Sequence, residues 1–108
     1  MELQIVKQNG INPKNMTAPE TFSIRLEEGD TVKEEKRAAK NGGEFKQYTL
    51  FLLDSQGGER ELRFLFPTHL NPLIAAYGGD TKLWEGKNVL VTPKTEGSFA
   101  DVVLSPAE

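Results

Sequence analysis

One short helical segment between groups of strand-like residues most constrains how this chain can fold. Asn71-Pro72 is a typical helix start, because Asn caps the free amides and Pro at the first helical position loses no hydrogen bond. Gly78-Gly79 ends the helix, since glycine adopts the left-handed cap conformation at little cost. A helix this short cannot connect parallel strands in the usual way, so we expect antiparallel pairing.

Apolar and polar residues alternate on both sides of this helix, which is the pattern of half-buried strands. Phe22, Ile24 and Leu26 begin the first such run, and Gly29 interrupts it; a glycine inside a strand marks a bulge or bend. A long, bent first strand can pair on both sides, as a small barrel requires. The predicted strands are residues 20–35, 44–54, 59–66, 87–93 and 99–104.

Three strands, one short helix and two further strands follow the order of the oligonucleotide/oligosaccharide-binding (OB) fold. The sequence therefore predicts an all-β domain with small α content: a five-stranded OB-type barrel with one short helix between strands three and four. The barrel spans residues 20–105, between an N-terminal extension (1–19) and a tail (106–108). Leu3, Ile5 and Val6 of the extension either add an edge strand or pack under the barrel, or else the extension forms a loose tail.

The length of 108 residues fits a single domain with one modest core. The longest apolar stretches, 50–53 and 73–77, fall far short of the roughly 20 residues needed to cross a bilayer. Without the pattern of a secretory signal at the N-terminus, we expect a cytoplasmic protein with no membrane partner. The absence of cysteine excludes disulfides, thiolate catalysis and the usual structural zinc sites.

Catalysis finds little support in the sequence. His69, the single histidine, precedes the expected helix without an evident Ser, Asp or Cys partner, so we assign it to capping or to the surface. The carboxylates are scattered and form no metal-ligand spacing. We therefore expect a protein that is not an enzyme and that uses no cofactor, no metal and no catalytic residue.

Basic and aromatic side chains gather around the loop between the first two strands and on the neighbouring strand. Single-stranded nucleic-acid binders need cations for phosphates and flat side chains on which bases stack. Because the net charge is −3, the cations that bind must be gathered locally. The predicted nucleic-acid-binding residues are Lys36, Arg37, Lys40, Phe45, Lys46, Tyr48, Arg63 and Lys94.

A simpler interpretation of this patch is that its loop cations only make the surface soluble, and Glu34, Glu35 and Glu44 dilute its charge. Strand alternation assigns three aromatic residues to the core: Phe51, Phe64 and Phe66. The sequence leaves open whether the remaining three face the core or the solvent: Phe45, Tyr48 and Phe99.

Residues 70–91 resemble a segment of small phage and archaeal OB-like proteins, some of which are supposed to bind single-stranded DNA. The resemblance rests on Tyr77-Gly78, an Asp-Thr pair and Trp84-x-Gly86-Lys87, and it covers about a fifth of the chain. Physically, Trp84 offers the largest apolar surface to plug the barrel, and Gly86 permits a tight entry into the next strand. No binding residue follows from this resemblance.

The sequence thus predicts a non-enzymatic protein of OB type that binds single-stranded nucleic acid, DNA in the first place, in replication, recombination or repair. The alternative is a protein-interaction module or accessory subunit with an OB-like fold, which would bind a protein partner or a second copy of itself. A contiguous apolar surface patch would favour the alternative.

Overall fold

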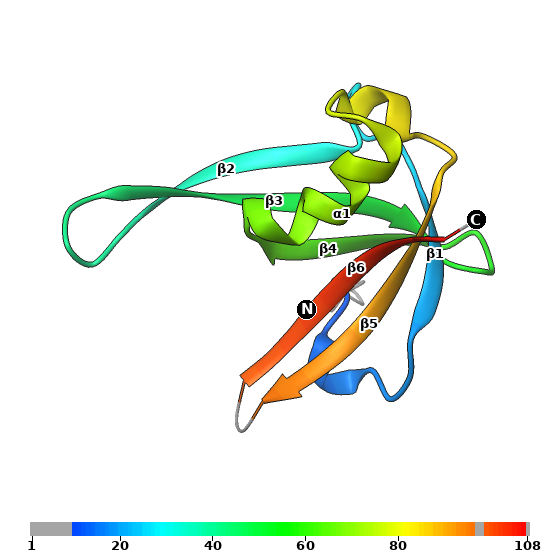
Figure 1. Ribbon diagram of the computed structural model, residues 1–108, viewed down its shortest axis with the longest axis horizontal. Coiled ribbons are helices and arrows are strands. Elements are labelled where there is room, and N and C mark those ends of the chain that lie inside the picture. Colours follow the sequence, from blue (N-terminus) through cyan, green and yellow to red (C-terminus); the bar gives the residue numbers. More distant parts are fainter. Residues whose placement is uncertain (1–9, 97–98, 108) are drawn as a thin grey trace, which may run out of the picture.

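The computed structural model describes residues 10–96 and 99–107, which form a mainly β structure with little helix (Figure 1). The strands are β1 (Glu20–Ile24), β2 (Val32–Ala38), β3 (Glu44–Leu53), β4 (Glu59–Leu65), β5 (Asn88–Glu96) and β6 (Phe99–Ala107). The helices of the described chain are α1 (Pro67–Tyr77) and the short 3-10 helices η1 (Pro13–Asn15) and η2 (Thr81–Trp84). The predicted class, an all-β domain with small α content, is confirmed.

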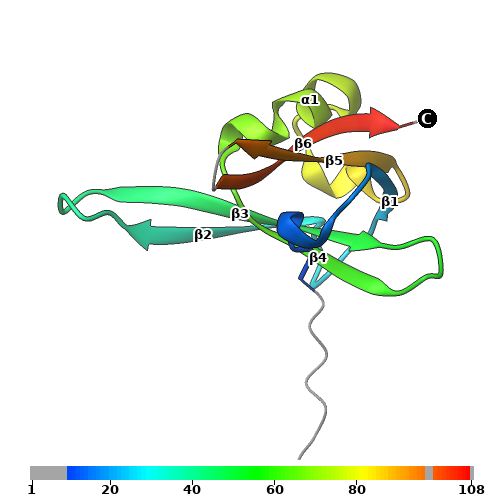
Figure 2. The ribbon, with the colours of Figure 1, turned by 90° about the horizontal axis from the view of Figure 1, so that it is seen from below.

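The strands form one antiparallel sheet in the order β2-β3-β1-β5-β6, with β4 paired to β3. β1 pairs with β3 near Leu52 and with β5 near Val89, and β2 continues the pairing with β3 at Leu50. β1 and β2 together therefore take the place of the predicted bent first strand, with partners on both sides. α1 packs mainly against β6 and also contacts β3, and the β2–β3 hairpin projects beyond the rest of the molecule (Figure 2).

The interruption of the first strand is a tight turn rather than a bend within one strand. The Glu27 N–H donates to the Asp30 carbonyl at 2.7 Å, and the Asp30 N–H donates back at 3.3 Å. The two residues between them have positive φ, 54° at Glu28 and 93° at Gly29, which is the conformation of a two-residue hairpin turn. Glycine at the second position adopts this conformation without steric cost.

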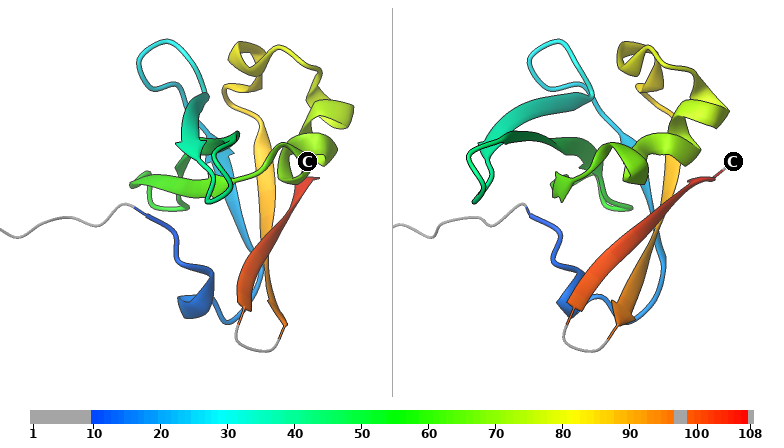
Figure 3. Two further views of the ribbon diagram at one scale, coloured as in Figure 1. Left: turned by 90° about the vertical axis from the view of Figure 1, so that its left-hand side faces the viewer. Right: turned by 60° about the vertical axis from the view of Figure 1, so that its left-hand side comes forward.

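A closed five-stranded barrel is not confirmed, because β4 and β6 do not pair within the described residues and the sheet stays open. Part of the N-terminal extension occupies this opening (Figure 3). The Ile11 N–H donates to the Glu61 carbonyl of β4 at 2.8 Å, and η1 packs against β5 and β6. Residues 10–19 thus pack against the sheet, while Leu3, Ile5 and Val6, on which the edge-strand prediction rests, lie outside the described chain.

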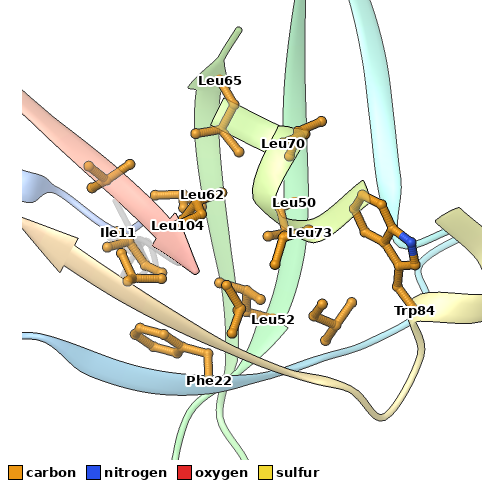
Figure 4. Packing of buried hydrophobic residues seen from close by; sticks show 14 residues of the cluster. Ile11, Phe22, Leu50, Leu52, Leu62, Leu65, Leu70, Leu73, Trp84 and Leu104 are labelled. Carbon is orange, nitrogen blue, oxygen red and sulfur yellow. The ribbon is translucent and has the colours of Figure 1, made fainter. Parts of the chain in front are cut away.

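The core lies between the sheet, α1 and the N-terminal segment (Figure 4). Trp84 is fully buried, as the sequence predicts, and its Nε1–H donates to the Gly78 carbonyl at 2.8 Å. Gly86 has a φ of 79° at the entry to β5, which agrees with its predicted role. Ile11 is buried with the sheet residues, so residue 11 belongs to the core and not to a separate extension. Burial of each large apolar side chain contributes about 1.5–3 kcal/mol.

The predicted helix start at Asn71-Pro72 is wrong, because the first helical residue is Pro67, five residues before Pro72. Pro67 takes the first helical position, where a missing N–H costs nothing. Pro72 lies inside the helix and leaves the Thr68 carbonyl without its helical donor. Thr68 and Pro72 are both exposed, so this interruption of the helix lies at the surface.

The last two strands are longer than predicted. β5 continues to Glu96, and β6 continues to Ala107, which pairs with Asn88. Pro106 and Ala107 therefore belong to the sheet instead of the predicted tail. Within the described residues, no helix has the length and apolar character needed to cross a membrane.

Candidate nucleic-acid interface

A groove of about 340 Å³ lies on the face of β2, β3 and β4 that is turned away from the core. Alternation along each strand produces this face, since the intervening residues, such as Leu50 and Leu62, point into the core. The groove is lined by Lys33, Glu35, Arg37, Gln47, Tyr48, Thr49, Phe51, Glu61, Arg63 and Phe64. Its lining therefore combines three cations, two carboxylates and three aromatic rings.

Each cation of the groove has a carboxylate beside it. Arg37 Nη2 lies 2.6 Å from Glu35 Oε2, and Lys33 Nζ lies 3.8 Å from Glu35 Oε1. Arg63 donates from both Nε (2.9 Å) and Nη2 (2.6 Å) to Glu61 Oε2. The side chains of the three cations are 46–61% exposed, so each pair contributes at most about 1 kcal/mol to stability.

A β-bulge in β4 changes which aromatic residues face the groove. Tyr48 pairs with Leu65 while Leu50 pairs with Leu62, so β4 has one more residue than β3 between these pairs. Phe64 adopts a φ of 63°, which is uncommon for a residue other than glycine. Leu62 and Leu65 consequently both point into the core, and Phe64 points outward.

The assignment of Phe64 and Phe66 to the core is therefore wrong. Their exposed fractions are 62% and 43%, because the bulge reverses the alternation and Phe66 lies at the turn into α1. Phe51 is buried at 6% exposure, as predicted, and lines the groove. Phe45, which the sequence left open, is 37% exposed. Phe99 begins β6, and its side chain lies outside the described part of the chain.

Ring contacts and strand pairing connect the three exposed phenylalanines through Arg37. The Arg37 guanidinium lies 6.0 Å from the centre of the Phe64 ring, and Arg37 is paired with Phe45 across the strands. The ring centres of Phe45 and Phe66 are 6.2 Å apart. We call Phe45, Phe64 and Phe66 the aromatic cluster.

The predicted site residues divide between two faces of the β2–β3 hairpin. Arg37 and Arg63 line the groove, and Tyr48 borders it while its hydroxyl lies on the other face. Lys46 and Lys36 are paired across the strands on the other face, where Glu34 accepts from both Lys46 Nζ and Tyr48 Oη at 3.2 Å. These two hydrogen bonds lower the pKa of Glu34, and Glu34 in turn raises the pKa of Lys46.

The two remaining predicted cations lie farther away. Lys40 is exposed in the turn that ends the β2–β3 hairpin. Lys94 is on β5 and pairs with Asp101 of β6. The β2–β3 hairpin and the β5–β6 hairpin point in different directions in Figures 1 and 3. The structure therefore does not bring Lys94 to the groove.

The predicted site leaves out seven of the ten residues that line the groove, Glu61 among them. Sequence reasoning kept Lys33 out of the site, treated Glu35 only as a diluting charge and placed Phe64 in the core. A signal for the last error was present, since the predicted alternation puts the apolar Leu65 on the polar face of its strand. A bulge is the usual way to reconcile such a conflict.

His69 caps α1, as the sequence predicts. Its Nδ1 accepts from the Phe66 N–H at 2.9 Å, and its Nε2 lies 2.9 Å from Asp101 Oδ1. Because Nδ1 accepts, the proton is on Nε2 and is donated to Asp101. Among the described residues, no group of three or more His, Cys, Asp or Glu could hold a metal ion.

Arg60 is separate from the groove, although it lies on β4. It lines a cavity of about 540 Å³ beneath the N-terminal segment, together with Ile11 and Glu20. Its Nε is buried and has no hydrogen-bond partner within the described chain. Arg60 is therefore not a contributor to the aromatic and basic surface of β2–β4.

Comparison of the chain with protein-family models finds no match, and comparison with curated proteins finds none either.

Proposed function

We propose that this protein binds single-stranded nucleic acid, DNA in the first place, on the groove and the aromatic cluster, without catalysing a reaction. The observation that supports this most is the set of three exposed phenylalanines connected through Arg37. Each exposed ring offers a platform on which a base can stack, worth roughly 1–3 kcal/mol per base. Arg37 and Arg63 supply guanidinium groups for the phosphates between those bases.

We further propose that the fold is of OB type, as in the phage and archaeal proteins that residues 70–91 resemble, and that the protein acts in the cytoplasm. The pairing of a bent first strand with β3 and β5, and the helix between β4 and β5, support this assignment. The N-terminal segment takes the place of the missing β4–β6 pairing. In an OB fold the second and third strands form the ligand face, and here these are β3 and β4.

A titration of a fluorescent oligothymidylate, followed by anisotropy at low salt, tests the proposal. Wild-type protein should bind, and Phe64→Ala or Phe45→Ala should each lower affinity by about 5-fold to about 150-fold, the equivalent of one lost stacked base. Ile74→Ala, which truncates an exposed residue on α1 away from the cluster, should leave affinity unchanged. Absence of binding at low salt would refute the function, and binding insensitive to both Phe variants would refute the site.

A protein-interaction module is the second candidate, and a specific observation favours it. Apolar side chains are also exposed outside the groove, at Ile74 (42%), Leu83 (67%) and Val103 (47%). Such residues fit a partner protein or a second copy of this chain if they form one patch. A stable oligomer on size-exclusion chromatography that Leu83→Ser or Val103→Ser dissociates, together with absent oligonucleotide binding, would establish this candidate over the first.

A further inference from the structure

The charges of the groove differ from its rings in one respect: the cations already have anionic partners. Glu35 lies between Lys33 and Arg37, and Glu61 accepts two hydrogen bonds from Arg63. A carboxylate in such a position has the charge and the acceptor oxygens of a phosphate. The aromatic cluster, in contrast, presents exposed ring surface at Phe64 and Phe66.

This difference matters for the two forms of DNA. A duplex presents its phosphates and keeps the faces of its bases stacked inside, so a protein surface gains mainly from phosphate contacts. A single strand presents base faces as well, which can stack on aromatic rings. A surface with paired cations and exposed rings therefore disfavours the duplex more strongly than the single strand.

We propose that Glu35 and Glu61 are specificity-determining residues that select single strands against duplex DNA; this inference rests on the proposed function. A phosphate that approaches Arg37 or Arg63 must first displace a carboxylate, which removes much of the gain from the contact. Duplex binding has no compensating contact, whereas single-strand binding keeps the stacking on the aromatic cluster. Specificity through a repulsive or competing group, rather than through added attraction, is a general device of selective surfaces.

The test compares wild type with the double variant E35Q/E61Q, whose substitutions keep side-chain size and remove both charges. Dissociation constants for a fluorescent oligonucleotide and for its duplex are measured by anisotropy over a series of salt concentrations. We expect duplex affinity at low salt to rise about tenfold or more and single-strand affinity to rise less, so that the preference for single strands falls. The plot of log K against log salt for the duplex should become steeper by about 1 to 2, because two more phosphates are neutralised.

The matched control is E44Q/E59Q, which changes the net charge by the same amount on β3, the neighbour of β2, and on β4. Glu44 begins β3 and Glu59 begins β4, both are exposed, and neither forms an ion pair with the described side chains. If the control raises duplex affinity as much as E35Q/E61Q does, the effect is one of overall charge and the inference is overturned.

Failure of the inference and failure of the proposed function can be told apart. Wild-type binding to the single strand, with an unchanged preference in E35Q/E61Q, overturns the inference alone. Absence of single-strand binding by the wild type overturns both. Thermal unfolding followed by circular dichroism establishes that the exposed substitutions leave the fold intact.

Discussion

Phe64 has two features that are unfavourable for a phenylalanine: a left-handed backbone conformation and an exposed ring. Its left-handed backbone costs about 1–2 kcal/mol for a residue with a Cβ, and its ring, 62% exposed, regains little of this through burial. Strained residues of this kind persist where the surrounding structure holds them, and they gather at ligand sites. An exposed aromatic ring held in this conformation is consistent with a surface that stacks on a ligand.

Two variants of Phe64 separate its strain from its ring. Phe64→Asn and Phe64→Ala both remove the ring, but Asn tolerates the left-handed conformation better than Ala. We expect Phe64→Asn to have a free energy of unfolding about 1 kcal/mol above that of Phe64→Ala, measured by urea denaturation. Both variants should lose affinity for an oligothymidylate by the same factor. Equal stabilities would contradict the left-handed backbone at this residue.

At the residue scale, the sequence indicated two cations of the groove better than the position of its aromatic residues. Arg37 and Arg63 were selected because cations and aromatic residues coincide there, and both line the groove. Phe64 was assigned to the core because alternation with a period of two cannot reveal an extra residue in the strand. The extra residue is evident only from the register between β4 and β3. The sequence of β4 alone does not specify that register.

Among the elements, the turn between β1 and β2 is held to η2 by one carboxylate. Asp30 Oδ1 accepts from the Thr31 N–H at 2.7 Å and from the Thr81 hydroxyl at 2.6 Å. The Thr31 hydroxyl donates to the Thr81 carbonyl at 2.5 Å. Burial alone would raise the pKa of Asp30, but these hydrogen bonds and Lys82 outweigh burial and lower it.

The lowered pKa of Asp30 gives the turn a defined dependence on pH. A carboxyl group with a lower pKa in the folded state stabilises the fold above its unfolded value, near 3.8, and loses that effect as pH falls through the folded value. Asp30→Asn should therefore cost about 1 kcal/mol at neutral pH, and the difference from wild type should shrink below pH 3.8.

Chemical denaturation of wild type and Asp30→Asn over a pH series measures this difference. Glu28→Gln controls for the loss of one negative charge from the same turn. A difference between wild type and Asp30→Asn that stays constant down to the lowest pH would show that ionisation of Asp30 does not stabilise the turn.

Element order was predictable because it depends on local signals, such as alternation, glycine turns and helix caps. The exact start of α1 was not, since Pro67 and Pro72 both satisfy the preference for Pro at the first helical position. The choice between them depends on His69, whose Nδ1 accepts the Phe66 N–H and whose Nε2 reaches Asp101 on β6. A contact with a strand thirty residues away is not visible in the local sequence.

For the molecule as a whole, the N-terminal segment completes the core where the sheet stays open. Ile11 is 8% exposed and pairs with β4 through its N–H. Sequence analysis treated residues 1–19 as an extension, because breaker signals dominate this stretch and the contact with Glu61 spans fifty residues. The groove was likewise only partly predicted. Lys94 belongs to the β5–β6 hairpin, which points away from the β2–β3 hairpin.

Truncation of Ile11 tests whether the segment is part of the fold. Ile11→Ala should lower the free energy of unfolding by about 2 kcal/mol or more, as large-to-small substitutions in a core do. Lys14→Ala, an exposed residue of the same segment, should change it by less than about 0.5 kcal/mol. Urea denaturation measures both. An unchanged stability in Ile11→Ala would mean that the core is complete without residue 11.

The position of the N-terminal segment in the opening of the sheet also has a consequence for synthesis on the ribosome. Chains emerge from the N-terminus, and early segments usually fold first. Here η1 packs against β6, so the first part of the described chain finds its place only when the last strand has emerged. The opening of the sheet therefore stays uncovered until β6 has emerged from the ribosome, and contacts of such long range form slowly.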